Sequence, residues 1–336
     1  MLESNTPCPA RDCHRWCGSL VTLPEGISGL RSLTRLDVSV CGQLCRLPDG
    51  IGGLGRLAEL NLSGCRSLAA LPDSIGALST LQWLDLSGCR SLSQLPDSIC
   101  GLHHLRLLNL SGCKQLHALP DGIGGLSGLL RLDMSGCNSL EALPDSIGGL
   151  SSLQQLCCGG CGQLEQIPDS LGRLSSLCRL DLSGSRRLSA LPDSIAALGE
   201  LADLSLNACR GLTVLPAGLG GLGKLQRLDL SWCDRLVELP DSVGELTNLQ
   251  WLSLRGCRRL KQLPGSIGCL VSLHVLDLGD CRTLVELPGP LFSLDSLQRL
   301  HLQGCKGLAT AIGGFAAHED STLLTSGARN TLLCCQ

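Results

Sequence analysis

The stretch LQWLDLSGCRSLSQLPDSICGL, residues 81–102, decides the fold, because its pattern returns every 24 residues along nearly the whole chain. Twelve prolines mark this interval without insertion or deletion, over the range Pro24–Pro288. A cysteine recurs at the same interval over Cys17–Cys305, with a single exception. A strict period of this length predicts a stack of equivalent structural units.

The chemistry of each letter predicts how one unit folds. Polar and apolar residues alternate over Leu84–Ser87, which predicts a short strand whose leucines face inward. We expect Cys89 to turn into the core and cap backbone groups of the leaving loop. At the exception, Ser185, a hydroxyl is expected to make the same bond. Pro96 and Asp97 predict the start of a short helical turn, with the proline in its first position and an acid favoured near its N-terminus.

No unit can bury its leucine stripe alone, so stacked units must share one continuous core. The consensus L-x-x-L-x-L-x-x-C-x-x-L-x-x-L-P is that of a leucine-rich repeat. It predicts a single α/β leucine-rich-repeat solenoid (horseshoe), with a parallel β-sheet on the concave face and short helical turns and loops on the convex face. Twelve repeats span residues 19–310. Residues 1–18 are predicted to be a degenerate N-terminal repeat or cap, and residues 311–336 a C-terminal cap or flexible tail.

Composition excludes several classes of protein. The 336 residues carry a formal net charge of −3, and 43% of them are hydrophobic. This composition is unlike that of a disordered chain, a membrane span or a nucleic-acid binder. The start of the chain, Met1–Cys17, has no apolar export signal, so we expect a cytoplasmic protein. The 22 cysteines are then expected to be mostly thiols, and the ladder cysteines in particular to be reduced.

The string L-x-x-L-D-L-S-G-C-x-x-L-x-x-L-P-D-S-I-G, as in residues 81–89 and 92–101, closely resembles the repeats of plant intracellular immune receptors. The nearest similarity is to the leucine-rich-repeat region of TIR-type nucleotide-binding disease-resistance proteins, over residues 17–310. The resemblance implies a sensor or regulatory module in innate immune signalling that binds a pathogen effector or a host signalling protein. Nothing in the chain resembles the TIR or nucleotide-binding domains. A substrate-recognition arm of a ubiquitin-ligase adaptor and a non-functional receptor fragment are the alternatives.

No motif predicts catalysis, a cofactor or a metal site. Gly218–Leu225 approaches a phosphate-binding loop, but Leu225 stands where the motif requires Ser or Thr. The cysteine clusters at Cys8–Cys17 and Cys157–Cys161 lack the matched C-x-x-C arms of a zinc site. We therefore expect a protein that is not an enzyme, with no catalytic residue, no cofactor and no metal.

Two columns of charge recur once per unit. The residue after the central strand leucine is Asp in every odd unit and never in an even one, which separates like charges or records duplication of a 48-residue pair. Four odd units read Arg-x-Asp, which predicts that the two charges neutralise each other: Arg35/Asp37, Arg131/Asp133, Arg179/Asp181 and Arg227/Asp229. The residue after the ladder cysteine is basic in eight units, which predicts either a solvated rim or a basic edge for an anionic partner: Arg66, Arg90, Lys114, Arg186, Arg210, Arg258, Arg282 and Lys306.

The concave surface is the predicted site for a protein partner. Its outer positions are monotonous Ser and Gly in units two to five, and the monotony breaks in units eight to twelve. Trp and Arg, which are over-represented at interface hot spots, gather there. Trp232 replaces a Gly of the repeat, which predicts that this position does not strictly demand a positive φ. The predicted partner-binding residues are Trp232, Trp251, Arg227, Arg255, Asp203, Arg299 and Trp83.

Overall fold

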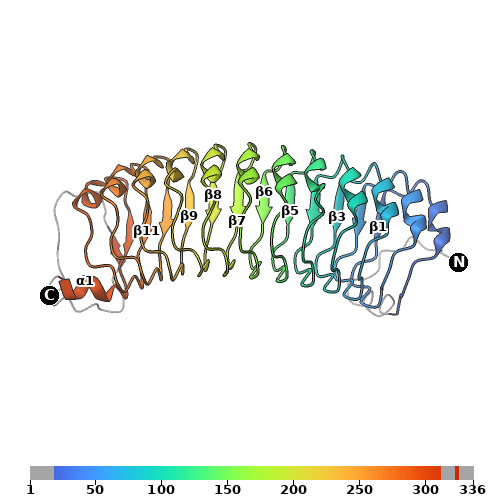
Figure 1. Cartoon of the computed structure of the whole chain (residues 1–336), viewed down its shortest axis with the longest axis horizontal. Coiled ribbons are helices and arrows are strands. Elements are labelled where there is room, and N and C mark those ends of the chain that lie inside the picture. The colour runs from blue at the N-terminus through green and yellow to red at the C-terminus, as the bar shows by residue number, and fades with distance from the viewer. Residues whose placement is uncertain (1–18, 312–321, 325–336) are drawn as a thin grey trace.

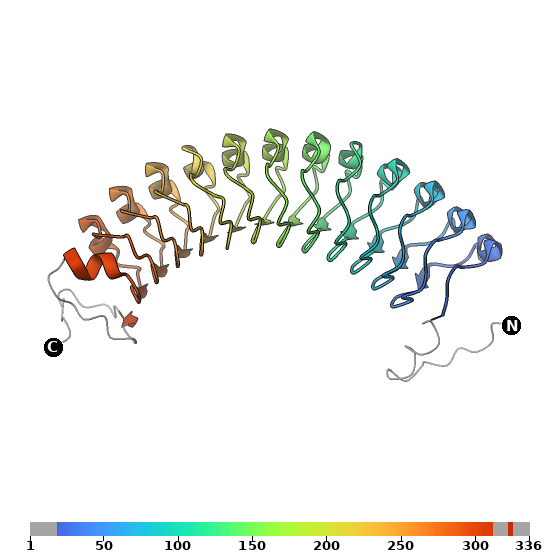
Figure 2. The ribbon, with the colours of Figure 1, turned by 60° about the horizontal axis from the view of Figure 1, so that its bottom comes forward.

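The computed structural model describes residues 19–311 and 322–324, which form one curved solenoid (Figure 1). In Figure 2 the chain traces an arc, with the strands along its inner side and the helical turns along its outer side. The predicted leucine-rich-repeat solenoid, with a parallel sheet on the concave face and helical turns on the convex face, is confirmed.

The sheet contains one short strand from each repeat, and we number the repeats by their strands. Residues pair in register with those 24 positions later, as Arg35 pairs with Glu59. The strand begins one residue earlier than the alternation predicts, at Trp83, and it ends at Asp85. It ends there because the Asp85 carboxylate accepts a hydrogen bond from the Ser87 backbone N–H at 2.8 Å, which turns the chain. The parallel strands are β1 (Arg35–Asp37), β2 (Glu59–Asn61), β3 (Trp83–Asp85), β4 (Leu107–Asn109), β5 (Arg131–Asp133), β6 (Gln155–Cys157), β7 (Arg179–Asp181), β8 (Asp203–Ser205), β9 (Arg227–Asp229), β10 (Trp251–Ser253), β11 (Val275–Asp277) and β12 (Arg299–His301).

The convex face is built from short 3₁₀ turns. Pro96 has an extended backbone (φ −69°, ψ 148°) and directly precedes its turn, so the proline is the residue before the turn and not its first residue, as we had predicted. Asp97 then opens the turn as predicted. The turns are η2 (Glu25–Gly29), η3 (Asp49–Gly53), η4 (Asp73–Ala77), η5 (Asp97–Gly101), η6 (Ile123–Gly125), η7 (Asp145–Gly149), η8 (Asp169–Arg173), η9 (Asp193–Ala197), η10 (Leu219–Gly221), η11 (Asp241–Glu245), η12 (Gly265–Cys269) and η13 (Gly289–Ser293).

Consecutive turns interlock through small residues. A Cβ on Gly148 would lie 2.4 Å from the Ser170 carbonyl oxygen of the next turn, so only glycine allows this approach. In three places a residue with a side chain stands at the glycine position and a glycine stands at the serine position of the following turn: Ser28/Gly50, Cys100/Gly122 and Ala196/Gly218. Where Cys100 replaces the glycine, Gly122 replaces the serine of the following turn, and that turn, η6, is shortened. Neighbouring repeats are thus matched to one another in sequence.

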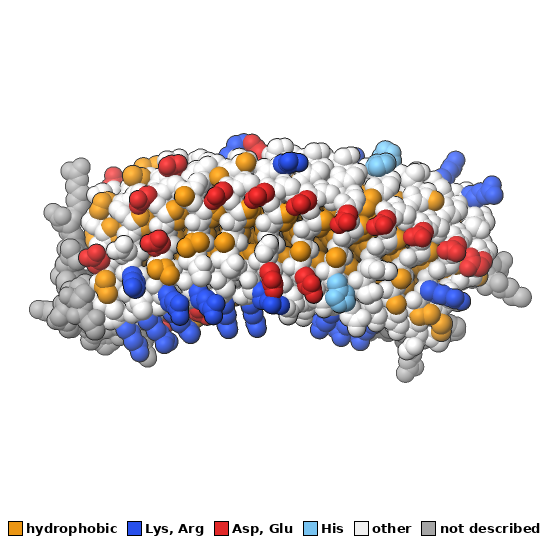
Figure 3. All heavy atoms as spheres, in the orientation of Figure 1, with side chains coloured by type: hydrophobic (Ala, Val, Ile, Leu, Met, Phe, Trp, Pro, Cys, Tyr) orange, Lys and Arg blue, Asp and Glu red, His pale blue; other side chains and the backbone are white. Residues whose placement is uncertain are grey.

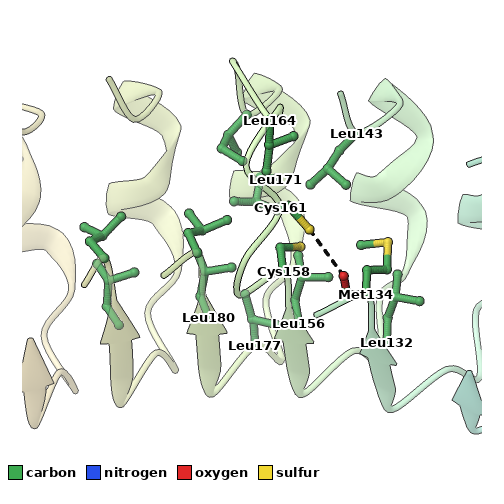
Figure 4. Packing of buried hydrophobic residues seen from close by; sticks show 14 of the residues in the cluster. Leu132, Met134, Leu143, Leu156, Cys158, Cys161, Leu164, Leu171, Leu177 and Leu180 are labelled. Atoms are coloured by element: carbon green, nitrogen blue, oxygen red, sulfur yellow. Dashed lines mark hydrogen bonds between the residues drawn. The ribbon is translucent and has the colours of Figure 1, made fainter. Parts of the chain in front are cut away.

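The core is a continuous stack of leucines joined by the cysteine ladder. Each described ladder thiol from repeat two onward donates to a backbone carbonyl of the preceding repeat, as Cys89 Sγ does to Leu62 O at 3.2 Å. Figure 4 shows the same bond from Cys161 to Met134 O, among the packed leucines. The expected capping role of the cysteines is confirmed. The remaining donor–acceptor pairs are Cys65–Val38, Cys113–Leu86, Cys137–Leu110, Cys209–Leu182, Cys233–Leu206, Cys257–Leu230, Cys281–Leu254 and Cys305–Leu278.

The prediction for Ser185 is wrong. Its hydroxyl oxygen is fully buried and has no hydrogen-bond partner. The C–O bond is shorter than the C–S bond, so a serine in the cysteine position does not reach the carbonyl of the preceding repeat. Repeat seven therefore lacks the thiol bond that its neighbours share.

The end of the sheet differs from the body of the solenoid. After Cys305 the chain forms the helix α1 (Lys306–Ala311), and β13 (Thr322–Leu324) pairs antiparallel with β12. The proposed N-terminal cap at residues 1–18 and most of the C-terminal cap at 311–336 lie outside the described residues, so both stay predictions.

Candidate functional site

The concave face displays two residues of each strand, on either side of a leucine that points into the core. We call the residue before this leucine the first column and the residue after it the second column. In β10 the first-column residue is Trp251 and the second-column residue is Ser253, while Leu252 between them is fully buried. The first column thus presents Asp203, Arg227, Trp251, Val275 and Arg299 along the C-terminal half.

The second column has a structural task. The Asp277 carboxylate accepts a hydrogen bond from the Gly279 N–H at 2.9 Å, and Asn109 accepts one from the Ser111 N–H at 3.0 Å. A short side chain with an acceptor oxygen is needed here to satisfy the loop that leaves the strand. This requirement explains why Asp and Asn dominate the column. Because both residues make the bond, it does not explain why Asp is restricted to odd repeats, and charge separation and duplication stay the two predicted explanations for that.

The electrostatics of the second column fit this task. Partial burial would raise the pKa of Asp133, but hydrogen bonds from the Ser135 amide and the Arg131 guanidinium outweigh burial, so the pKa lies below its ordinary value. An ionised carboxylate that already accepts these bonds is a structural group and not a proton-transfer catalyst.

The predicted Arg-x-Asp neutralisation holds in two of the four units. Arg131 contacts Asp133 at 2.9 Å, and the Arg35–Asp37 pair is longer, at 3.8 Å. In the other two units the prediction is wrong, because each arginine reaches across to the next strand. Arg179 lies 3.8 Å from Asp203, and the Arg227 guanidinium lies 3.9 Å from the centroid of the Trp251 ring. Opposite charge and an aromatic face directly across the sheet outcompete the residue two positions away.

A positive φ is required at the residue before each ladder position, which contradicts the prediction drawn from Trp232. Eight repeats carry glycine there with φ from 70° to 78°. The four others adopt the same left-handed conformation with a side chain: Val40, Ala208, Trp232 and Asp280, at φ 58° to 61°. The Trp232 N–H donates to the Arg255 carbonyl oxygen at 2.6 Å. This bond is one of the backbone hydrogen bonds between consecutive repeats that impose the left-handed conformation. Trp232 is thus held in a conformation that costs a residue with a Cβ about 1–2 kcal/mol.

The Trp232 indole lies across the next repeat. A Cβ on Gly256 would stand 2.4 Å from indole Cε3, so the ring occupies space that only glycine leaves open. The Arg258 guanidinium approaches the ring centroid at 5.8 Å. The arginine beside this tryptophan is therefore Arg258, which was predicted for the basic edge and not for the partner-binding set.

Trp251 has a different setting. It lies in β10, directly between Arg227 on β9 and Val275 on β11. Both tryptophans are half-buried, and each has a guanidinium near its ring. Trp232 and Trp251 stand in different columns, and no ring contact joins them.

The remaining predicted residues divide between this cluster and other partners. Arg255 pairs with Asp280 at 3.0 Å, and the ring contacts seen among the described residues are made by Arg227 and Arg258 instead. Arg299 is exposed, and the described part of the chain gives it no ion pair. Trp83 lies in β3 between Glu59 and Leu107, seven strands away from Trp251. The structure therefore unites Asp203, Arg227 and Trp251 in one row, places Trp232 beside them, and leaves Trp83 apart.

A buried hydroxyl pair underlies the cluster. Ser231 Oγ lies 2.6 Å from the Asp229 carboxylate and 2.7 Å from Ser253 Oγ, and both serines are nearly inaccessible to solvent. These bonds fix the backbone on either side of Trp232 and Trp251. The two rings are thus held on a rigid base, as a recognition site requires.

The described residues show no sign of catalytic chemistry. Burial raises the pKa of the Cys89 thiol to about 12, which makes it a poor nucleophile at neutral pH. Cys161 in the mid-chain cluster already donates to Met134, and no group of three potential metal ligands occurs in residues 19–311 or 322–324. Leu225, in the loop that approaches a phosphate-binding motif, is fully buried in the core. Within the same residues no helix is long and apolar enough to cross a membrane.

A leucine-rich-repeat solenoid with an open, shaped concave face is a scaffold for protein interaction, and this fold is typically non-enzymatic. Comparison with known families agrees. A model of the leucine-rich repeat region matches residues 84–206, and a model of the Leucine Rich Repeat matches residues 248–270.

Two solved structures share this architecture with TM-scores above 0.5. The leucine-rich repeat domain of the type III effector XopL is 28% identical over 75% of this chain and 78% of that chain, with a TM-score of 0.52. A chain of the Drosophila Toll–Spatzle complex is 21% identical over 76% of this chain and 38% of that chain, with a TM-score of 0.56. A Leptospira interrogans leucine-rich-repeat protein is 29% identical over 85% and 88% of the two chains, with a TM-score of 0.44. A search of curated protein sequences gave no match.

Proposed function

We propose that the protein recognises a protein ligand through the concave face of repeats eight to twelve. The observation that carries this proposal is the pair of half-buried indoles, Trp232 and Trp251, in adjacent repeats where the uniform Ser and Gly positions of repeats two to five are interrupted. A guanidinium lies near each ring, Arg227 at 3.9 Å from the Trp251 centroid and Arg258 at 5.8 Å from the Trp232 centroid. Aromatic side chains on a rigid base, with arginine beside them, are the usual anchors of protein interfaces.

Backbone strain supports the same site. Three of the four side chains held at positive φ, Ala208, Trp232 and Asp280, lie in repeats eight, nine and eleven. Eight of the nine other repeats carry glycine at this position, at no such cost. Strain that persists where glycine would relieve it is typical of functional positions.

We further propose that this recognition serves innate immune signalling of the plant type in the cytoplasm, with a pathogen effector or a host signalling protein as the ligand. This assignment is supported by the resemblance of the L-D-L-S-G-C and L-P-D-S-I-G strings to the repeats of plant receptors. The similarity to other leucine-rich-repeat structures supports the recognition module.

The test is affinity capture from plant cytosol with wild type and with a Trp232→Gly/Trp251→Ala variant. Captured proteins are identified by mass spectrometry and their binding is measured with purified components. We expect the variant to lose a specific ligand, whereas Trp83→Ala, a control in an isolated position, retains it. A ligand bound equally by wild type and the double variant would refute the site.

A further inference from the structure

The edge of the solenoid that follows the ladder position carries a row of cations. In repeats seven to twelve the five positions after each ladder residue hold nine basic and three acidic side chains, a local net charge of +6 in a chain of formal net charge −3. Figure 3 shows these blue side chains gathered along the lower edge of the molecule. We call them the basic rim: Arg186, Arg187, Arg210, Arg235, Arg258, Arg259, Lys261, Arg282 and Lys306.

The rim already holds carboxylates of its own chain. Asp234 stands in the column where the repeats on either side carry Arg210 and Arg258, and the two Nε atoms lie 3.6 and 3.7 Å from its oxygens. Arg187 likewise contacts Glu165 of the preceding repeat at 2.5 Å. Guanidinium groups two repeats apart therefore bind a carboxylate that lies between them.

Toward the C-terminal end the same cations have no such partner. Arg259, Lys261 and Arg282 are exposed and form no ion pair within the described part of the chain. Lys261 stands in one column between Val237 and Val285, whose exposed fractions are 40% and 48%. Unpaired cations beside exposed apolar side chains mark a surface that interacts with another molecule.

We infer that the basic rim of repeats nine to twelve binds an acidic segment of a partner protein. The carboxylates of this acidic segment bind the arginines as Asp234 does within the chain, and its apolar atoms cover the exposed Val237 and Val285. Single-stranded nucleic acid fits this surface less well. The five positions after each ladder residue in repeats seven to twelve contain no aromatic side chain on which a base could stack. One rim residue, Arg258, lies 5.8 Å from the Trp232 ring centroid. The inference rests on Arg259, Lys261 and Arg282, and so not on the proposed function.

The test measures the binding of a fluorescein-labelled octa-glutamate peptide to the full chain by fluorescence anisotropy. The rim variant is Arg259→Gln/Lys261→Gln/Arg282→Gln. The matched control is Arg31→Gln/Arg56→Gln/Arg106→Gln, which removes the same charge from exposed residues outside the rim that also have no described ion pair. We expect the rim variant to bind about tenfold more weakly, equivalent to about 1.4 kcal/mol. The control should change affinity by less than about twofold, because its charges lie beyond a Debye length of about 10 Å in 0.1 M salt.

Two results would overturn the inference. Equal weakening by the rim variant and the control would show that the peptide responds only to net charge. The second result is that the octa-glutamate peptide does not bind, while wild type, but not the rim variant, sediments with phosphatidylserine vesicles. The rim would then bind a membrane surface and not an acidic protein segment. Retention of octa-glutamate binding by the Trp232→Gly/Trp251→Ala variant would show that the two surfaces act independently, and its loss would contradict their separation.

Discussion

Replacing Trp232 by glycine and by alanine separates backbone strain from side-chain contacts. Both changes remove the indole from Gly256 and Arg258, so they lose the same cation–π contact. They differ only in the Cβ, which alanine retains at a φ of 61°. The left-handed conformation costs a residue with a Cβ about 1–2 kcal/mol, and the greater chain entropy of glycine in the unfolded state offsets part of this. We therefore expect Trp232→Gly to be more stable than Trp232→Ala by about 1 kcal/mol.

Urea unfolding followed by circular dichroism measures this difference. With a slope of about 3 kcal/mol/M, the midpoint of the glycine variant should lie about 0.3 M above that of the alanine variant. Gly199 is the control, because its φ is not positive and a Cβ there would meet nothing within 4 Å. At Gly199 we expect alanine to be neutral or stabilising.

Equal midpoints for the two Trp232 variants would refute the reasoning, because the left-handed backbone would then cost nothing. The glycine variant also sharpens the binding test. Since it relieves strain, any loss of ligand binding by this variant results from the missing ring and not from unfolding.

Three further predictions follow from the interior of the solenoid. Gly148→Ala should destabilise the protein by about 1–3 kcal/mol in urea unfolding, because its Cβ would meet the Ser170 carbonyl oxygen at 2.4 Å. Gly29→Ala is the control and should not destabilise it, because a Cβ there would meet nothing within 4 Å. Equal urea midpoints for the two variants would contradict the close packing of consecutive turns. Ser185→Cys should raise the free energy of unfolding by about 1 kcal/mol, because a thiol can reach the carbonyl that the buried hydroxyl misses, and an unchanged urea midpoint would count against the ladder bond. The native pKa of Cys89 is raised from 9.0 to about 12, so the folded protein holds this proton more tightly than the unfolded chain does. The contribution of Cys89 to the free energy of unfolding should therefore be fully present below about pH 9 and be lost as pH rises toward 12. A urea midpoint that is unchanged between about pH 8 and about pH 11 would contradict this.

Much of the fold could be predicted because the repeat is strict. The 24-residue period fixed the leucine stripe, and one unit can bury that stripe only against another. Details inside the unit were harder to predict. The alternation over Leu84–Ser87 does not reveal that the strand ends at Asp85, because the ending depends on a hydrogen bond from Ser87 to the aspartate side chain. The role of Ser185 failed for a similar reason, since a bond length decides whether the acceptor is reached.

The candidate binding site stays a prediction, and its contacts could be predicted only in part. The residues of the C-terminal half were chosen by composition, and the structure places Asp203, Arg227 and Trp251 in one row. The signal for Trp232 was present but misread. Its partner is Gly256 one repeat later, and comparing neighbouring repeats at that position would have shown that a large side chain is followed by glycine there.

The sequence by itself determined the solenoid, the face that its strands form and the row of thiols, because each depends on one residue type recurring at one interval. Only the tertiary structure decided the left-handed backbone at Trp232 and the ion pair of Arg255 with Asp280. Stacking brings residues 24 or 25 positions apart into contact. The backbone hydrogen bonds between consecutive repeats then impose one backbone conformation on every unit. Whether a side chain then meets its neighbour in the chain or the one in the next repeat depends on geometry that the period alone does not contain.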